Sequence, residues 1–120
     1  MKYALLVYNP SENGPTFEEF QAMQGDWFQV TTDLVNSGDY VTGEALLPAE
    51  TATTLTATTG SRVTTDGPFA ETKDYLAGFY IVDVADLDAA LDWAEKLPTA
   101  RYGKVEIRPV VVFDTPVEGA

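Results

Sequence analysis

The sequence predicts a single α+β domain in which two helices pack on one face of a β-sheet. Strand-like and helix-like segments alternate along the chain in the order strand, helix, strand, hairpin, strand, helix, strand. No segment is long enough or rich enough in glycine and serine to divide the chain, so residues 1–120 are expected to form one domain. Two helices on one face of a sheet built in this order give a ferredoxin-like sandwich.

The expected strands are apolar runs bounded by turn residues. The first, Lys2 to Tyr8, is apolar on both faces, which is typical of a central strand covered on both sides. A Thr-rich segment turns back through Thr59-Gly60-Ser61, which predicts a β-hairpin. In the last segment Glu106 and Arg108 alternate with apolar residues, so they share a face that is either a pocket wall or plain solvent surface, and Pro109 favours a sheet edge or bulge. The further strands are expected over 39–47, 51–58, 62–65, 76–84 and 104–113.

Two segments have helical periodicity. Thr16 and Glu19 are spaced as a capping box at the start of the first helix, and Gly38 suits the left-handed position after its end. Gly25 weakens this helix, so we expect either a closely packed neighbour or a bend there. Asp86 caps a second helix, which runs to Leu97. The first helix is expected over 17–36, with its apolar stripe at Phe20, Met23, Trp27, Val30 or Thr31, and Leu34.

One face of the predicted sheet has no cover within the chain, because two helices that pack together on one face cannot also cover the other. A second copy of the chain is the simplest cover, since two-fold homodimers are the commonest soluble oligomers. The sequence therefore predicts a homodimer. The residues expected on the uncovered face are Tyr3 or Leu6, Phe79 or Tyr80, and Ile107.

Composition excludes several classes of function. Nineteen acidic residues against seven basic ones give a formal charge of −12, which repels phosphate backbones and anionic lipids, so neither nucleic acid nor a membrane is an expected partner. The chain has no Cys and no His, which excludes disulfides, thiolate or imidazole metal sites, and Ser-His-Asp triads. Its carboxylates show no metal-binding spacing, so neither metal nor cofactor is expected. The short apolar run at the N-terminus is not a signal sequence, and we expect a cytoplasmic protein.

The densest cluster of reactive groups lies between Thr64 and Lys73 on a loop between two predicted strands. It holds two carboxylates, an ammonium group, three hydroxyls and an aromatic ring, and functional groups gather on loops held by a rigid scaffold. Two interpretations remain open. The cluster lines a site, or it is structural, with Asp66 hydrogen-bonding the turn that it opens and Lys73 pairing with Glu71 in solvent.

The run TDGPFAETK, followed by LAGFYIVDVADLDAALDWAEKLP and GKVEIRPV, resembles the YCII-related family, in particular its DGPF-domain branch. MKYALLVY and GEALLP fit the same family, so the resemblance covers nearly all of residues 1–113. It implies a ferredoxin-like fold that pairs into a dimeric α/β barrel with a pocket near the sheet face. Some members are thought to use a His and Asp pair, of which this chain retains only the motif aspartate. The motif positions carried over are Asp66, Gly67, Pro68, Phe69, Glu71, Thr72 and Lys73.

These observations support three functional hypotheses. The leading one is a homodimer that binds a small organic molecule in a pocket beside the Asp66–Lys73 loop, with the binding residues Arg62, Phe69, Glu71, Thr72 and Lys73. The second is a lyase, isomerase or hydrolase in which Asp66, or Glu44, is the acid/base and Lys73 or Arg62 holds an anionic substrate. The third is a regulatory interaction module, because genes for proteins that look like this often neighbour those for alternative sigma factors.

Overall fold

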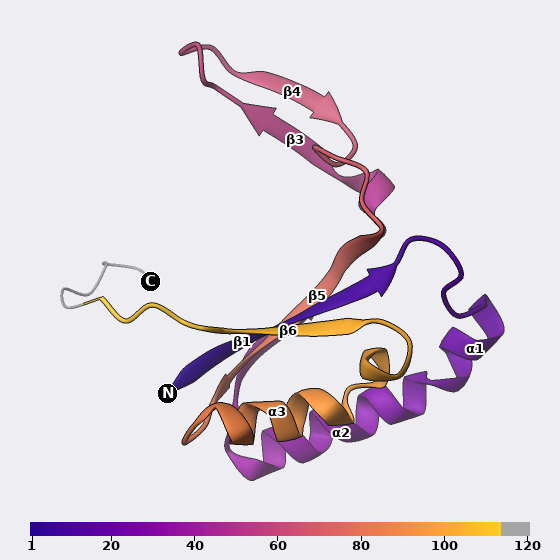
Figure 1. Cartoon of the computed structure of the whole chain (residues 1–120), viewed down its shortest axis with the longest axis vertical. Helices are drawn as coiled ribbons and strands as arrows, with labels where there is room; N and C mark the ends of the chain where they lie inside the picture. Colours follow the sequence, from indigo (N-terminus) through magenta and orange to yellow (C-terminus); the bar gives the residue numbers. More distant parts are fainter. Residues whose placement is uncertain (114–120) are drawn as a thin grey trace.

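The computed structural model describes residues 1–113, which form a four-stranded antiparallel sheet, helices on one of its faces and a separate two-stranded hairpin (Figure 1). The strand order in the sheet is β2-β5-β1-β6, so the first strand is central, as predicted. This confirms the α+β class. The sheet strands are β1 (Lys2–Pro10), β2 (Tyr40–Ala45), β5 (Asp74–Asp83) and β6 (Lys104–Pro109). The other elements are α1 (Phe17–Ala22), α2 (Gln24–Ser37), α3 (Leu87–Lys96), the 3₁₀ turns η1 (Ala49–Thr51) and η2 (Pro98–Arg101), and the hairpin strands β3 (Thr53–Thr56) and β4 (Val63–Asp66).

The core lies between the helices and one face of the sheet. Burial alternates along β1, where Tyr3, Leu5 and Val7 are buried and the residues between them are partly exposed. This is the period-two pattern of a strand with one covered face. The remaining buried apolar residues come from β5, the helices and the segments that flank them: Val30, Leu34, Val82, Val84, Ala90, Ala94 and Leu97.

No helix or strand of residues 1–113 packs on the other face of the sheet, which we call the open face. Residues opposite each other on neighbouring strands share a face, and Leu6 pairs with Phe79 on β5 and with Glu106 on β6. By the same register Arg108 shares this face with Glu106, as predicted. The full set is Ala4, Leu6, Tyr8, Thr42, Glu44, Leu76, Phe79, Ile81, Lys104, Glu106 and Arg108.

Leu6 and Phe79 were therefore correctly expected on the uncovered face, whereas Tyr3 and Tyr80 lie on the helix side. The expectation for Ile107 is wrong. Ile107 pairs with the buried Leu5 and packs against the core. A strand's alternation shows which residues share a face, but the pairing register decides which face that is.

The first helix is broken into two. Met23 ends α1 and begins α2, two residues before Gly25. A Cβ at Gly25 would have no heavy atom within 4 Å, so the glycine accompanies a bend and not a close contact. The capping box of Thr16 and Glu19 is present, and Gly38 ends α2 with a φ of 87°. None of these helices, nor any other in residues 1–113, is long and apolar enough to cross a membrane.

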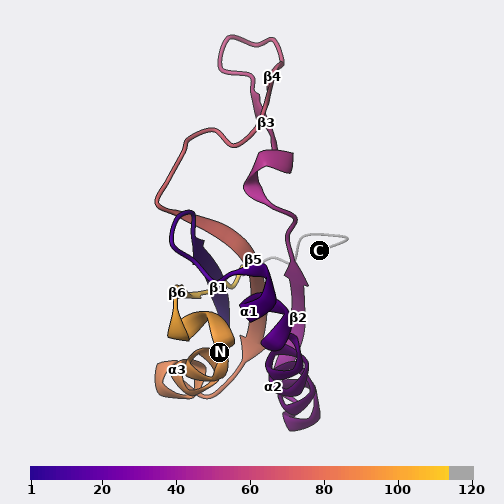
Figure 2. The ribbon, with the colours of Figure 1, turned by 90° about the vertical axis from the view of Figure 1, so that its right-hand side faces the viewer.

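The predicted hairpin forms, and it stands away from the sheet. It belongs to the connection between β2 and β5, residues 46–73, which we call the arm. Figures 1 and 2 show the hairpin on the side of the sheet opposite to the helices, which is the side of the open face. The radius of gyration is 16.5 Å, whereas a compact domain of this length has about 13.6 Å. Within residues 1–113, the hairpin of the arm is therefore not packed onto the rest of the chain.

Candidate functional site

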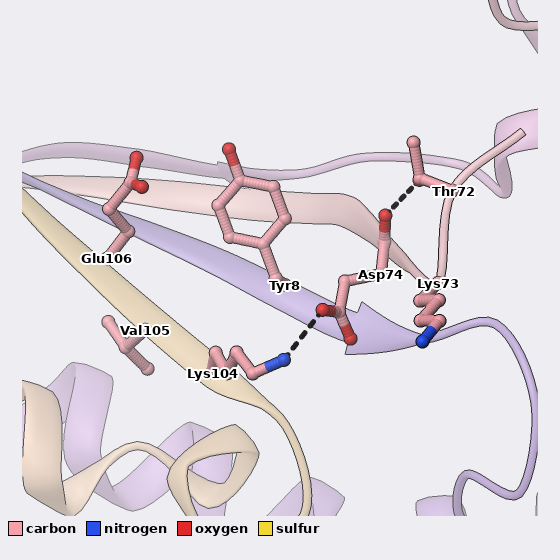
Figure 3. Close-up of a pocket in the computed structure, with 7 residues that line it drawn as sticks. All are labelled: Tyr8, Thr72, Lys73, Asp74, Lys104, Val105 and Glu106. Atoms are coloured by element: carbon pink, nitrogen blue, oxygen red, sulfur yellow. Dashed lines mark hydrogen bonds and ion pairs between the residues drawn. The ribbon is translucent and has the colours of Figure 1, made fainter. Parts of the chain in front are cut away.

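A pocket of about 620 Å³ lies where β1 ends and β6 begins (Figure 3). We call it the Lys73 pocket. Its walls come from the end of the arm and from three sheet strands. The lining residues are Tyr8, Thr72, Lys73, Asp74, Lys104, Val105 and Glu106.

Strand register brings the sheet residues of this pocket together. Tyr8 pairs with Lys104, and both project from the open face together with Glu106. Figure 3 shows Tyr8 and Glu106 on the same side of the sheet, while Val105 points to the other side. A Cβ at Gly103 would collide with the carbonyl oxygen of Tyr8. Only a glycine therefore lets β6 begin this close to the end of β1.

The end of the arm is fixed against β1 by Ser11. Its hydroxyl donates to the carbonyl oxygens of Thr72 and Lys73, at 2.9 Å each, and its backbone N–H donates to the Lys73 carbonyl at 2.8 Å. The Thr72 hydroxyl donates to the carbonyl of Asp74. These bonds hold the backbone from Thr72 to Asp74 in one conformation, so the Lys73 side chain leaves the chain at a defined place.

The lining residues of the pocket include two lysines, Asp74 and Glu106, and within residues 1–113 one ion pair forms among them. Lys104 Nζ lies 2.8 Å from Asp74 Oδ2. The Lys73 ammonium forms no ion pair with any residue in 1–113, and the Tyr8 hydroxyl makes no hydrogen bond within that range. Figure 3 shows the Lys73 nitrogen and the Tyr8 hydroxyl pointing to opposite sides of β1, so the cation alone is placed to bind a carboxylate or phosphate oxygen.

Of the site residues predicted from the sequence, the structure places Thr72 and Lys73 in this pocket. Arg62, Asp66, Phe69 and Glu71 lie elsewhere on the arm, all exposed, and they do not line it. Their roles remain predictions.

The two contacts that a structural role of the Thr64–Lys73 cluster would involve are not found in the structure of residues 1–113. Among residues 1–113, Lys73 and Glu71 form no ion pair and the Asp66 side chain accepts no hydrogen bond. The turn is held by backbone groups instead: the N–H of Gly67 donates to the carbonyl of Ala52 at 2.6 Å. The Thr54 hydroxyl also donates to the carbonyl of Gly67, at 2.8 Å.

Sequence reasoning did not select Tyr8, Asp74 or Lys104 for a binding role. The alternation at Glu106 was the one signal that a pocket wall could lie on β6. Within residues 1–113 no three Asp or Glu side chains gather closely enough to hold a metal ion.

Comparison with known proteins shows to which family the chain belongs. Residues 1–114 match the model of the YCII-related domain, a range that includes the sheet, the arm and the whole Lys73 pocket. An uncharacterised protein of Rhizobium meliloti (strain 1021) is 38% identical over 117 residues, which cover 94% of each chain. The chain belongs to the YCII-related family.

Proposed function

We propose that this protein is a homodimer that binds a small organic anion in the Lys73 pocket, beside the Asp66–Lys73 loop. The observation that carries the proposal is Lys73, which lines the pocket and forms no ion pair within residues 1–113. The chain has only seven basic residues against nineteen acidic ones. An unpaired cation held by an anchored backbone is therefore the feature of this surface best suited to an anionic ligand.

The open face supports pairing with a second copy. Its centre is apolar, with Ala4, Leu6, Phe79 and Ile81 on adjacent strands, and charged side chains stand on β6 at its edge. An apolar centre with a polar rim is the usual anatomy of a protein interface. The arm extends on the same side, with Phe69 88% exposed. A second copy stacked on this face would bury these groups.

Pairing would also complete the Lys73 pocket, since Tyr8 and Glu106 belong both to the pocket and to the open face. In the pair we propose that Arg62, Phe69 and Glu71 reach the ligand from the arm. The sheet order, with helices on one face only, supports a ferredoxin-like topology, and two such sheets stacked face to face would form a dimeric α/β barrel. The Asp66-Gly67-Pro68-Phe69 run supports the DGPF branch of the family.

We place binding before catalysis. Asp66 is an exposed carboxylate at the end of β4, outside the pocket formed by one chain. A role as acid/base would require it to reach the ligand across the pair. The protein is proposed to be cytoplasmic, with the small molecule and its own second copy as its partners.

The proposal is tested by calorimetric titration with benzoate and succinate, after native mass spectrometry of freshly purified protein to detect a ligand already bound. Lys73→Gln should weaken carboxylate binding about 10- to 100-fold, the range expected for a hydrogen bond to a charged group. Lys2→Gln removes the same charge at the far end of β1 and is the matched control. Equal weakening in both variants, or no heat with either acid, would contradict the proposal.

A further inference from the structure

A second cavity, of about 530 Å³, lies under α1 and α2 on the helix side of the sheet. We call it the helix-side cavity. Among the described residues, none lines both this cavity and the Lys73 pocket. Its volume falls within the range of about 300–1,000 Å³ that is usual for small-molecule sites. Seven aromatic residues are among its described lining: Phe20, Trp27, Phe28, Tyr40, Phe79, Tyr80 and Tyr102.

The Asn9 side chain contributes a polar group to the lining of the cavity. This side chain is only 8% exposed, and its Oδ1 accepts a hydrogen bond from the Thr99 hydroxyl at 3.4 Å. The Tyr102 hydroxyl lies 3.3 Å from the same Thr99 oxygen. When Thr99 donates its one proton to Asn9, the Tyr102 hydroxyl is left to donate to Thr99. All three residues line the cavity.

The amide nitrogen of Asn9 is the donor left over from this chain of hydrogen bonds. It has no hydrogen-bond partner in residues 1–113. Every fully buried side-chain nitrogen or oxygen in that range does have a partner, so this nitrogen is not fully buried. The nitrogen is therefore at the cavity surface, where it presents N–H groups to whatever occupies the space. Water can accept from these N–H groups when no ligand is bound, whereas an apolar occupant would displace that water and leave the donor unpaired, so an acceptor oxygen on the occupant would be favoured.

The charge of the cavity excludes an anion. None of its described lining residues is Lys or Arg, and the only ionisable carboxylate is Glu44, at the edge strand β2. The chain as a whole carries a formal charge of −12. An anion would therefore lose its hydration and find no cation in return. An uncharged ligand does not incur this penalty.

The entrance is also apolar. Phe28 is 77% exposed and Phe20 is 39% exposed, although both belong to the wall. They flank the break between α1 and α2, and α1 buries none of its own residues. A flat ring that entered here would contact these side chains face to face or edge to face, and would remove them from water.

We propose that the helix-side cavity binds an uncharged aromatic compound that carries a carbonyl oxygen, which accepts a hydrogen bond from the Asn9 amide. This site is independent of the Lys73 pocket and of the proposed function. It differs from that pocket in ligand charge, in the face of the sheet and in the residues that hold the ligand.

The test compares three probes of one shape on the full chain, with quenching of tryptophan fluorescence as the readout, since Trp27 lines the cavity. The probes are 2-acetylnaphthalene, 2-ethylnaphthalene and 2-naphthoate. The ketone should bind about three- to tenfold more tightly than the ethyl compound, because only the ketone accepts the hydrogen bond. The naphthoate should bind more weakly still. This comparison uses the unaltered protein, so it does not depend on the folding of a variant.

Two variants locate the probe. Asn9→Ala should abolish the preference for the ketone over the ethyl compound, while Asn36→Ala, at an exposed position near the end of α2, should preserve it. Lys73→Gln should leave ketone binding unchanged. The proposal is overturned if none of the probes binds, if the naphthoate binds as well as the ketone, or if Lys73→Gln weakens ketone binding.

Discussion

Replacement of Leu6 by Asp should separate the proposed homodimer into monomers without unfolding the chain. Leu6 lies at the centre of the open face, between Phe79 on β5 and Glu106 on β6. Its side chain is already partly exposed in one chain. The substitution therefore adds little strain to the monomer, whereas in a stacked pair it places a carboxylate in the middle of the interface.

The size of the effect follows from symmetry. Burying the remaining half of a leucine side chain is worth about 1 kcal/mol, and a two-fold pair contains the residue twice. Desolvation of a buried carboxylate adds several kcal/mol per copy, and Glu106 directly opposite adds like-charge repulsion, which the diagonal neighbour Arg108 offsets in part. A total of at least about 6 kcal/mol corresponds to a rise of roughly 10⁴-fold in the dimer dissociation constant, at 1.4 kcal/mol per factor of ten.

Sedimentation equilibrium at micromolar concentration distinguishes the 13.0 kDa chain from a pair of twice that mass. Leu91→Asp is the control, because Leu91 is 44% exposed on α3, away from the open face. The control should remain dimeric, and circular dichroism should show a melting temperature close to that of the wild type for both variants. A wild-type monomer, or a Leu6→Asp dimer with an unchanged dissociation constant, would refute the reasoning.

Three further predictions concern stability. Gly78→Ala should destabilise the fold by about 1–3 kcal/mol in thermal melts, because the new Cβ would lie 2.8 Å from the backbone oxygen of Glu44. Gly25→Ala lies in open space on a helix and should stabilise the fold by up to about 1 kcal/mol. Shifts of the same sign in the two variants would contradict the geometry. Asp86→Ala removes the N-cap of α3 and should cost about 1 kcal/mol in urea unfolding, whereas Asp86→Asn should keep most of it. Asp66→Asn should change stability by less than about 0.5 kcal/mol, since the side chain is exposed and accepts no hydrogen bond from residues 1–113; a large loss of stability would show that the carboxylate holds the turn.

Local chemistry explains why much of the fold could be predicted. The Thr16 and Glu19 capping box, the left-handed Gly38 and the Asp86 cap each depend on residues within four positions of one another. The order of the helices and strands along the chain then left only a few possible strand orders for the sheet. The face of Ile107 was misjudged because it depends on pairing with Leu5, about 100 residues away along the chain.

The candidate site could be predicted only where it is continuous in sequence. Thr72 and Lys73 belong to a conspicuous loop, and both line the pocket. Tyr8 and Lys104 are brought to them by the register of β1 with β6, and by the irregularity in the pairing of β1 with β5, where Ala77 is the extra residue; neither feature can be recognised from composition. The helix-side cavity was missed for a different reason: its aromatic residues have the same helical spacing as a filled core.

The two cavities should respond differently when the pair is separated. The Lys73 pocket opens on the face that a second copy is proposed to cover, and two of its residues, Tyr8 and Glu106, would lie in the interface. The helix-side cavity is formed under α1 and α2, and Phe79 is the one residue from the apolar centre of the open face among its described lining residues. A chain made monomeric by Leu6→Asp should therefore lose benzoate affinity and retain that for 2-acetylnaphthalene. Loss of both would mean that pairing also shapes the helix side, through Phe79 and its neighbours on β5.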